Sequence, residues 1–383
     1  MNQRFLVLDS FRGIAAICVV IFHMHIIGSI TELNFFRGSS LFVEFFFVLS
    51  GFVLAHTYGF KDVTFKRFII SRTFRLYPLH LFMFFIFVLL ELGKLIAYNY
   101  GFSFNNEPFS NSYSLKEVLP NLLFLQSWLP FTIPTSWNGP AWSLSVEYYM
   151  YIIFFFTLFI KSNLKYIVWF LFSLISFYMI INSFGIMSEV IRGLSCFFAG
   201  ALTYLIYRKI NLKFEKINTN LFSVVEFLLI FLIIYIISYV EEYKAIYASL
   251  IFLVIVFFFA FEKGVLSKIL KASFFQLLGK LSYSIYMTHA AILYCLVSVS
   301  MVLEKILNKK FAPMIETVRY IDFGNIFINN FVVFIILFIV IFIIELLLQL
   351  SLLYLAYHLH FQFVLGYLLV LGYLLHNSHN ENI

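Results

Sequence analysis

The sequence contains very few charged residues, and this scarcity limits the class of protein. Only 12% of its 383 residues are Asp, Glu, Lys or Arg, whereas 62% are hydrophobic and 21% are aromatic. So little charge excludes a soluble globule, because polar side chains must cover such a surface, and the mean hydropathy of +0.96 agrees. We therefore expect an all-α, polytopic bundle of transmembrane helices, each of about 20 mostly apolar residues.

Cysteine is equally scarce, and the three cysteines lie inside apolar runs without disulfide or metal-ligand spacing. Cys18, Cys196 and Cys295 are expected to be small hydrophobic residues, and no metal site or redox chemistry is predicted. The N-terminal apolar run carries Asp9 and Arg12 and lacks a small-residue cleavage site after a short apolar core. It is therefore expected to be a retained first transmembrane helix and not a removed signal peptide.

Apolar runs predict about ten transmembrane spans with short connections. They lie near residues 11–30, 39–58, 76–98, 141–160, 164–182, 190–207, 221–240, 245–262, 277–303 and 326–350. The net charge of +7 does not indicate nucleic-acid binding, because the basic residues form short clusters between apolar runs. With the N-terminus in the cytoplasm, most of the 26 Lys and Arg residues fall on the cytoplasmic side, which favours this orientation.

The parts of the chain outside these spans lead to two further expectations. The connection 99–140 is rich in Pro, Gly and aromatic residues and is expected to form a partly ordered lid at the outer membrane surface. Residues 1–350 are expected to form one transmembrane domain. The segment 351–383 stays largely apolar but carries His358 and His360, so an extra span, a re-entrant segment and an interfacial helix all remain open.

Ionisable side chains inside apolar spans require an explanation, because inserting each one costs about 2.5–3.5 kcal/mol. In the first span Arg12 and His23 are 11 residues apart, so both project from one helix face, with Asp9 on nearly the same stripe. Their axial separation of about 16 Å puts Arg12 at the cytoplasmic boundary and His23 near mid-membrane. The guanidinium could hold coenzyme A phosphates while the imidazole meets a thioester. The alternatives are a snorkelling arginine and a histidine satisfied by a neighbouring helix.

The run LDSFRGIAAICVVIFH resembles the Arg-x10-His opening helix of acyltransferase family 3, membrane enzymes that O-acylate bacterial surface carbohydrates and some secreted small molecules. Four later segments resemble the family in the same order: FFFVLSGFVLAH (45–56), SRTFRLYP (71–78), WSLSVEYYMY (142–151) and GKLSYSIYMTH (279–289). The chain departs from the family pattern at Tyr148, where a second acid is usual. It also lacks the closing Glu-x-Pro, because Glu345 is followed by Leu-Leu-Leu-Gln.

The resemblance implies an active site built from several helices. Arg72 and Arg75 would join Arg12 in binding the phosphates of acyl-CoA, although simple positive-inside anchoring also explains this pair. His23 and Glu147 would be catalytic, with Glu147 orienting a base or binding the acceptor hydroxyl. The alternative for Glu147 is an interfacial acid paired with an external base.

Other polar residues are expected to line the cavity or the acceptor site. Glu44 lies in a phenylalanine-rich stretch and needs a buried partner or a water-filled cavity. Ser282, Tyr286 and His289 recur at spacings of four and three, so they form one polar helix stripe, although interhelical hydrogen bonding also explains the first two. Asp9 completes this expected set.

These residues predict a multi-pass O-acyltransferase of the bacterial inner membrane. It would transfer an acyl group, commonly acetyl in the family, from cytoplasmic acyl-CoA to a hydroxyl of a surface carbohydrate such as lipopolysaccharide O-antigen or exopolysaccharide. His23 would either deprotonate the hydroxyl or carry the acyl group transiently, and the sequence leaves both open. Acyl-CoA as co-substrate, the carbohydrate and the bilayer are the expected partners, without metal or nucleic acid. A carrier or flippase for a lipid-linked saccharide, and a non-catalytic assembly protein, are the alternatives.

Overall fold

The protein is almost entirely helical in the computed structural model, which describes residues 4–342 apart from positions 103, 105, 161, 186, 215–217 and 317. The segment 351–383 lies outside the described residues. The longer helices are α1 (Leu6–His23), α3 (Phe42–Tyr58), α4 (Phe65–Asn99), α6 (Ala141–Leu158), α7 (Leu164–Ile181), α8 (Ser188–Phe214), α9 (Thr219–Tyr239), α10 (Lys244–Phe259) and α12 (Ser273–Leu307). Shorter elements are α2 (Asn34–Arg37), α5 (Val118–Leu122), α11 (Val265–Leu270) and a hairpin of β1 (Met314–Ile315) and β2 (Val318–Arg319).

Eight of the described helices are long and apolar enough to cross a bilayer, which confirms the all-α, polytopic membrane fold. Two shorter apolar helices, Lys244–Phe259 and Ile326–Phe342, bring the apolar helices to the ten positions at which spans were expected. That all ten cross the membrane stays a prediction. The first span lies earlier than expected, because the chain leaves α1 at Met24 with an extended backbone and then pairs Ile26 with Ile321.

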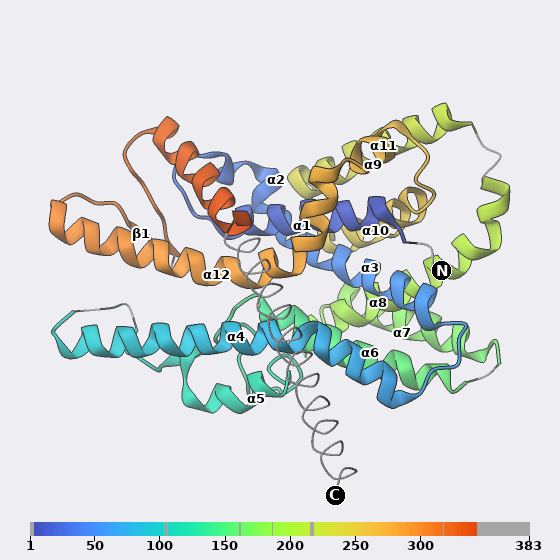
Figure 1. The fold of residues 1–383 in the computed structure, drawn as a ribbon, viewed down its shortest axis with the longest axis horizontal. Helices are drawn as coiled ribbons and strands as arrows, with labels where there is room; N and C mark the ends of the chain where they lie inside the picture. The colour runs from blue at the N-terminus through green and yellow to red at the C-terminus, as the bar shows by residue number, and fades with distance from the viewer. Residues whose placement is uncertain are drawn as a thin grey trace, which may run out of the picture.

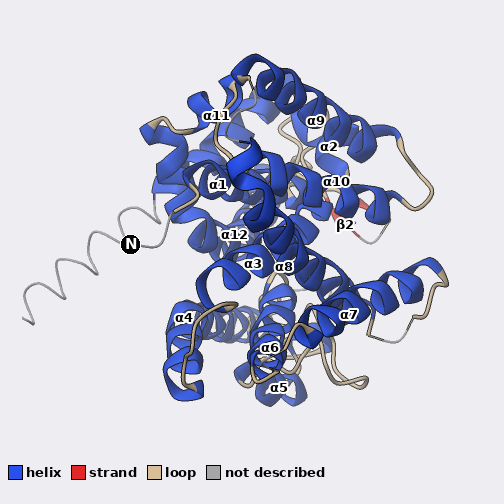
Figure 2. Cartoon of the chain, turned by 90° about the vertical axis from the view of Figure 1, so that its right-hand side faces the viewer, coloured by secondary structure: helices blue, strands red, loops and turns tan. Residues whose placement is uncertain are grey.

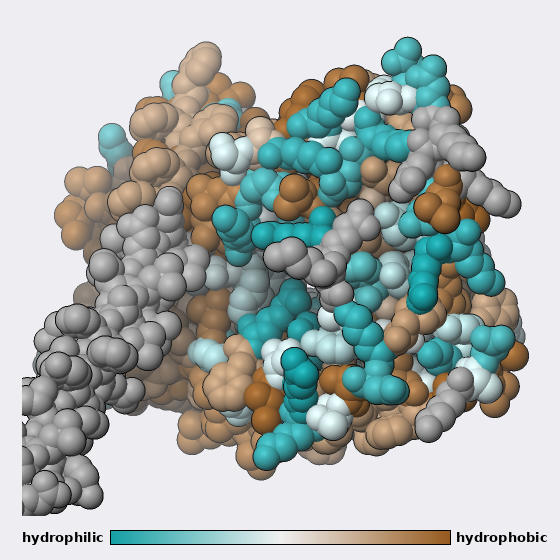
Figure 3. Space-filling view, turned by 45° about the vertical axis from the view of Figure 1, so that its right-hand side comes forward, coloured by the Kyte–Doolittle hydropathy of each residue, from teal (hydrophilic) through white to brown (hydrophobic). Residues whose placement is uncertain are grey.

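Helices α1, α4 and α12 run in the same direction. Gly13 and Arg12 of α1 contact Gly279 near the start of α12, and His23 at the end of α1 meets His289 at the middle of α12. Further contacts align α4 with α12, since the hydroxyl of Tyr283 donates to the carbonyl oxygen of Leu76 and the rings of Phe87 and Tyr294 are 6.4 Å apart. All three helices therefore begin at one end of the molecule (Figure 1). Hydrophilic side chains gather on the face that Figure 3 turns toward the viewer, which includes this end.

Helices α3 and α8 form the centre of the bundle, with α4, α5 and α6 on one side and α9 and α11 on the other (Figure 2). Glycines let α3 and α8 approach closely: a Cβ atom on Gly51 would collide with the carbonyl of Phe197, and one on Gly200 with the carbonyl of Val48. Small residues commonly permit such packing in membranes, where there is no hydrophobic drive for helix association. Gly51 and Gly200 therefore serve the packing of α3 against α8.

The connection between α4 and α6 packs as part of the bundle, although its composition predicted a surface lid. Phe124 and Trp137 are almost fully buried, and the side-chain amide of Asn138 donates to the carbonyl oxygen of Met287 on α12 at 3.0 Å. The segment also buries several polar side chains, namely Glu117, Asn121, Gln126, Ser136 and Asn138. Large aromatic residues supply enough buried area to hold these polar groups inside.

Candidate active site

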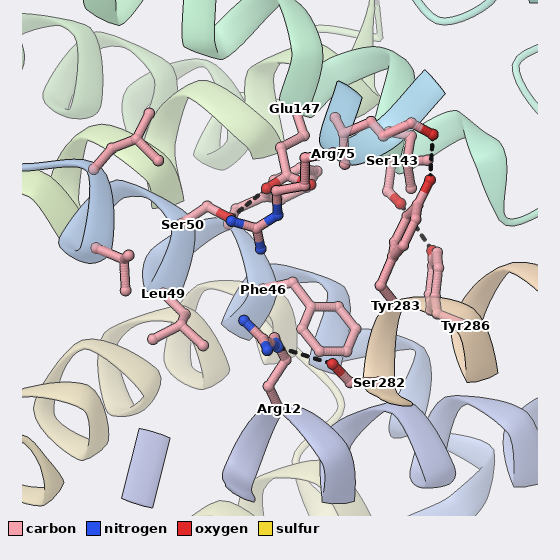
Figure 4. Close-up of a pocket in the computed structure, with 15 residues that line it drawn as sticks. Arg12, Phe46, Leu49, Ser50, Arg75, Ser143, Glu147, Ser282, Tyr283 and Tyr286 are labelled. Atoms are coloured by element: carbon pink, nitrogen blue, oxygen red, sulfur yellow. Dashed lines mark hydrogen bonds between the residues drawn. The ribbon is translucent and has the colours of Figure 1, made fainter. Parts of the chain in front are cut away.

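A cavity lies among five helices of the bundle and encloses about 740 Å³ of space, including some open to solvent. We call it the central cavity (Figure 4). Its polar lining comes from Arg12 on α1, Ser50 on α3, Arg75 on α4, Ser143 and Glu147 on α6, and Ser282, Tyr283 and Tyr286 on α12. Four segments that resemble the family therefore meet the opening helix at one place. Apolar side chains, chiefly from α3, form the rest of the wall.

Arg12 is held in a fixed orientation at the wall of the central cavity. Its Nε donates to Ser282 Oγ at 2.8 Å, and its Nη2 donates to the carbonyl oxygen of Gly279 at 2.9 Å. Asp9 adds an ion pair at 3.4 Å. This geometry depends on the close approach of α1 and α12, where a Cβ on Gly13 would come within 2.5 Å of the backbone of Leu278. The Arg12 side chain is 28% exposed, so part of it remains accessible.

Arg75 faces the same cavity from α4 and is exposed. It makes no hydrogen bond or ion pair with any residue in the described part of the chain. Figure 4 shows it beside Glu147, with Arg12 across the cavity. Arg72, three residues earlier, does not line the cavity. Its Nη2 donates to the Tyr58 hydroxyl at 3.2 Å and its guanidinium lies 5.9 Å from the centre of the Tyr151 ring.

Glu147 accepts two hydrogen bonds through one carboxylate oxygen. The hydroxyl of Ser50 on α3 and the hydroxyl of Tyr151, one turn further along α6, both donate to Oε1. Because Arg72 packs on Tyr151 and Arg75 lies beside Glu147, the carboxylate sits within a positively charged surrounding.

Tyrosine hydroxyls complete the wall on the α12 side. The hydroxyl of Tyr286 lies 2.9 Å from that of Ser143 and donates to the carbonyl oxygen of Pro140 at 3.2 Å. The Phe46 ring packs edge-on against Tyr286, with 5.7 Å between centroids. One turn beyond Tyr286, the helix places His289, whose ring centroid is 5.9 Å from the Tyr286 centroid.

His23 and His289 form an imidazole pair next to the central cavity, and neither is among its lining residues. Their ring centroids are 5.1 Å apart with an interplanar angle of 35°. His23 ends α1 and is exposed, whereas His289 is fully buried. Two residues beyond His23, His25 accepts a hydrogen bond from Arg37 at 2.7 Å. Burial, and then the charge of Arg37, lower the pKa of His25.

Glu44 and Asp9 lie outside the central cavity. Glu44 is buried and forms an ion pair with Arg192 of α8 at 2.6 Å, and the Arg192 guanidinium in turn lies 5.2 Å from the centre of the Trp142 ring. The buried partner required for Glu44 is thus Arg192, which is not among the expected site residues. Asp9 pairs with Arg4 at 2.7 Å as well as with Arg12.

The structure brings most of the expected site residues together and adds four. Arg12, Arg75, Glu147, Ser282 and Tyr286 line one cavity, and His23 and His289 meet beside it. Ser50, Ser143, Tyr151 and Tyr283 are not among the expected residues. Ser50 lines the cavity, whereas the adjacent Gly51 packs against the carbonyl of Phe197. No three His, Cys, Asp or Glu residues gather into a metal-binding group within the described residues.

Comparison with known proteins adds independent information. The sequence model of a family described as an acyltransferase domain matches residues 5–350. Acyltransferase MdmB of Streptomyces mycarofaciens is 40% identical over 118 residues, which are 30% of this chain and 27% of that protein. Protein 2 in the picA locus of Rhizobium radiobacter is 35% identical over 165 residues, 38% of this chain and 78% of that protein. The chain thus covers about a quarter of the first relative and most of the second. No solved structure gives a significant match.

Proposed function

The chain belongs to acyltransferase family 3, and on that premise we propose that it transfers an acyl group from cytoplasmic acyl-CoA to a hydroxyl of a cell-surface carbohydrate. Acetyl is the proposed acyl group, and the bacterial inner membrane is the proposed location. Lipopolysaccharide O-antigen and exopolysaccharide are the acceptor classes that we propose to test. The donor, the acceptor and the location are therefore proposed here, whereas the family membership is the premise.

The observation that supports the proposal most is a pair of guanidiniums at the wall of a membrane-embedded cavity. Arg12 is oriented by Ser282 and Gly279, and Arg75 has no hydrogen bond or ion pair of its own in the described part of the chain. Leaving a cation in such a place is costly unless an anion or water satisfies it. Arginine suits phosphate because its planar fork donates two parallel hydrogen bonds.

A donor bound in this way would reach the imidazole pair. Arg12 and Arg75 would hold the phosphates of acyl-CoA, and the pantetheine arm would extend along α1 toward His23, about 16 Å from Arg12 along the helix axis. Phe46 and Tyr286 line the central cavity and pack against each other, and the Tyr286 ring centroid lies 5.9 Å from that of His289. The arm would therefore turn at least one of these two rings aside as it binds.

The proposed chemistry uses His23 as the group that contacts the reacting atoms. The acceptor hydroxyl gives its proton to the imidazole while its oxygen bonds to the thioester carbonyl carbon. The carbon–sulfur bond then breaks, and the departing thiolate takes the proton from the imidazolium. In the second route, a ring nitrogen of His23 displaces coenzyme A first and the hydroxyl then displaces the imidazole. Glu147 would keep the charge of the cavity balanced.

A carrier or flippase for a lipid-linked saccharide is the alternative from another functional class. It would account for many spans and for buried polar side chains, but it gives no role to a thioester. Nor does it explain why Arg12 and Arg75 line one cavity while His23 and His289 pair next to it. An assembly protein without catalysis would leave these residues with structural roles alone.

One assay separates the three functions. Purified protein in lipid nanodiscs would be incubated with acetyl-CoA labelled in the acetyl group and with surface polysaccharide isolated from the source cells. We expect release of free coenzyme A thiol and transfer of label to the glycan, and we expect both to be lost in His23→Ala. Saccharide movement across proteoliposomes without thioester loss would instead establish a carrier. Mass spectrometry of surface glycans from cells with and without the protein would identify the acceptor.

A further inference from the structure

The imidazole pair contains a buried nitrogen that has no hydrogen-bond partner in the described part of the chain. His289 lies at the middle of α12 and is fully buried. Its Nδ1 is 3.3 Å from the carbonyl oxygen of Ile285, one turn earlier on the same helix. A carbonyl accepts and does not donate, so Nδ1 carries the hydrogen. Nε2 is then a hydrogen-bond acceptor, and it has no partner among the described residues.

The neighbour that can use this acceptor is His23. The two ring centroids are 5.1 Å apart, which allows a hydrogen bond between the imidazoles after a small rotation or through one water. The ring of Phe22 also packs against His23. His25 interacts with His23 electrostatically, but its Nδ1 already accepts a hydrogen bond from Arg37. His289 also contacts the Tyr286 ring and the backbone of Ile285 and Tyr286.

No carboxylate is available to orient His23 within the described residues. Glu44, which is one candidate, is held in its ion pair with Arg192. Glu147, the other, accepts from Ser50 and Tyr151 at the central cavity. A base histidine normally needs a partner at its second nitrogen, and that partner fixes the tautomer and the ring orientation.

From this geometry we propose that His289 is the positioning residue of His23, taking the place that a carboxylate holds in other histidine-based sites. His289 Nε2 accepts a hydrogen bond from one ring nitrogen of His23, which leaves the other nitrogen of His23 free to take the proton of the acceptor hydroxyl. As that proton arrives, the lone pair of His289 stabilises the charged His23 ring. This inference rests on the proposed acyl transfer for its catalytic meaning, whereas the pairing itself is independent of the substrate.

The pairing can be tested on the purified full chain without any acyl donor. Diethyl pyrocarbonate modifies imidazole nitrogens in proportion to their nucleophilicity, and mass spectrometry gives the rate at His23. We expect His289→Leu to slow this modification about tenfold and His289→Gln, whose amide oxygen can accept the same hydrogen bond, to restore part of the rate. His56→Gln is the matched control and should leave the rate at His23 unchanged, because His56 lies on α3 and contacts Phe5 and Tyr204. An unchanged rate in His289→Leu would overturn the proposal.

Acyl transfer by the same variants distinguishes this inference from the proposed function. We expect His289→Leu to lower kcat by about 10²-fold, within the usual range for general-base catalysis, with KM for acyl-CoA unchanged. His289→Gln should again recover part of kcat, and adding His289→Leu to His23→Ala should cause no further loss. If wild-type protein transfers acyl groups and His289→Leu does so equally well, the pairing is wrong and the function stands. If modification at His23 depends on His289 but wild-type protein consumes no thioester, the pairing stands and the function is wrong.

Discussion

Arg75 lines the central cavity from α4, and the residue as a whole is exposed. If it binds a phosphate of acyl-CoA, removing it deletes a charge-assisted hydrogen bond of about 1.5–3 kcal/mol. We expect Arg75→Ala to raise KM for acyl-CoA by about 10- to 150-fold with a smaller change in kcat. Steady-state kinetics at several acyl-CoA concentrations measures this.

The matched control for Arg75 is Arg67→Ala. Arg67 lies two turns earlier on α4, is exposed, and does not line the cavity. Its replacement should leave KM near the wild-type value. Equal effects of the two substitutions would mean that the helix contributes general positive charge and not a defined phosphate site.

Glu147 links α3 to α6 through a single oxygen atom that accepts from Ser50 and Tyr151. Tyr151 is fully buried, so Glu147→Ala leaves its hydroxyl unpaired and should lower the free energy of unfolding by about 1–3 kcal/mol. Glu147→Gln keeps an acceptor oxygen and should retain most of that stability. Thermal unfolding in detergent compares the two variants. A glutamine variant as unstable as the alanine variant would show that the charge, and not the hydrogen bonds, stabilises this contact.

The contact between α1 and α12 positions Arg12, because the arginine bonds to the Gly279 carbonyl and to Ser282 across it. A Cβ on Gly279 would collide with the carbonyl of Asp9. Gly279→Ala should therefore separate the helices, lower the free energy of unfolding by about 1–3 kcal/mol, and raise KM for acyl-CoA. Unfolding curves and steady-state kinetics would both be recorded.

Gly93→Ala is the control for that substitution, since no atom lies within 4 Å of a Cβ placed on Gly93 of α4. It should leave stability and KM unchanged or slightly improved, because alanine favours a helix over glycine. Wild-type behaviour of Gly279→Ala would contradict the close approach of α1 and α12.

How far the sequence predicts these elements differs from helix to helix. Length and apolar composition place the membrane helices well, and eleven-residue spacing predicts that Arg12 and His23 share a face of α1. Spacing along one helix says nothing about which face meets which neighbour. Ser50 therefore could not be assigned to the cavity, and Arg192 could not be identified as the partner of Glu44, because both depend on contacts between helices distant in sequence.

The spacing of Arg72 and Arg75 also fails to predict their neighbours, although the two residues are only three positions apart. Their spacing of three predicted two guanidiniums that act together, yet α4 turns Arg75 into the cavity and Arg72 against Tyr58 and Tyr151. Three positions on a helix differ by about 60°, which is enough to place side chains on different sides of a packed wall. The binding role expected for Arg72 stays a prediction.

Helices α1, α4 and α12 run parallel and begin at the same end of the molecule. The basic clusters predict that this end faces the cytoplasm. Single cysteines at Lys66 and Asn111, both exposed, test the orientation after the native Cys18, Cys196 and Cys295 are replaced by serine. In intact spheroplasts a membrane-impermeant maleimide should label position 111 at once and position 66 only after permeabilisation. The reverse labelling would invert the topology and place the arginine cavity toward the outside.

Transfer across the membrane is the most direct test of the proposed reaction. Proteoliposomes that hold the chain in one orientation would enclose the glycan acceptor, while acetyl-CoA labelled in the acetyl group is added on the side where α1 begins. We predict that label accumulates on the enclosed glycan with wild-type protein, falls sharply with Arg75→Ala at low acetyl-CoA, and is absent with His23→Ala. Undiminished transfer by His23→Ala, or no transfer by the wild-type protein from that side, would contradict the proposed path from the arginines to the imidazole.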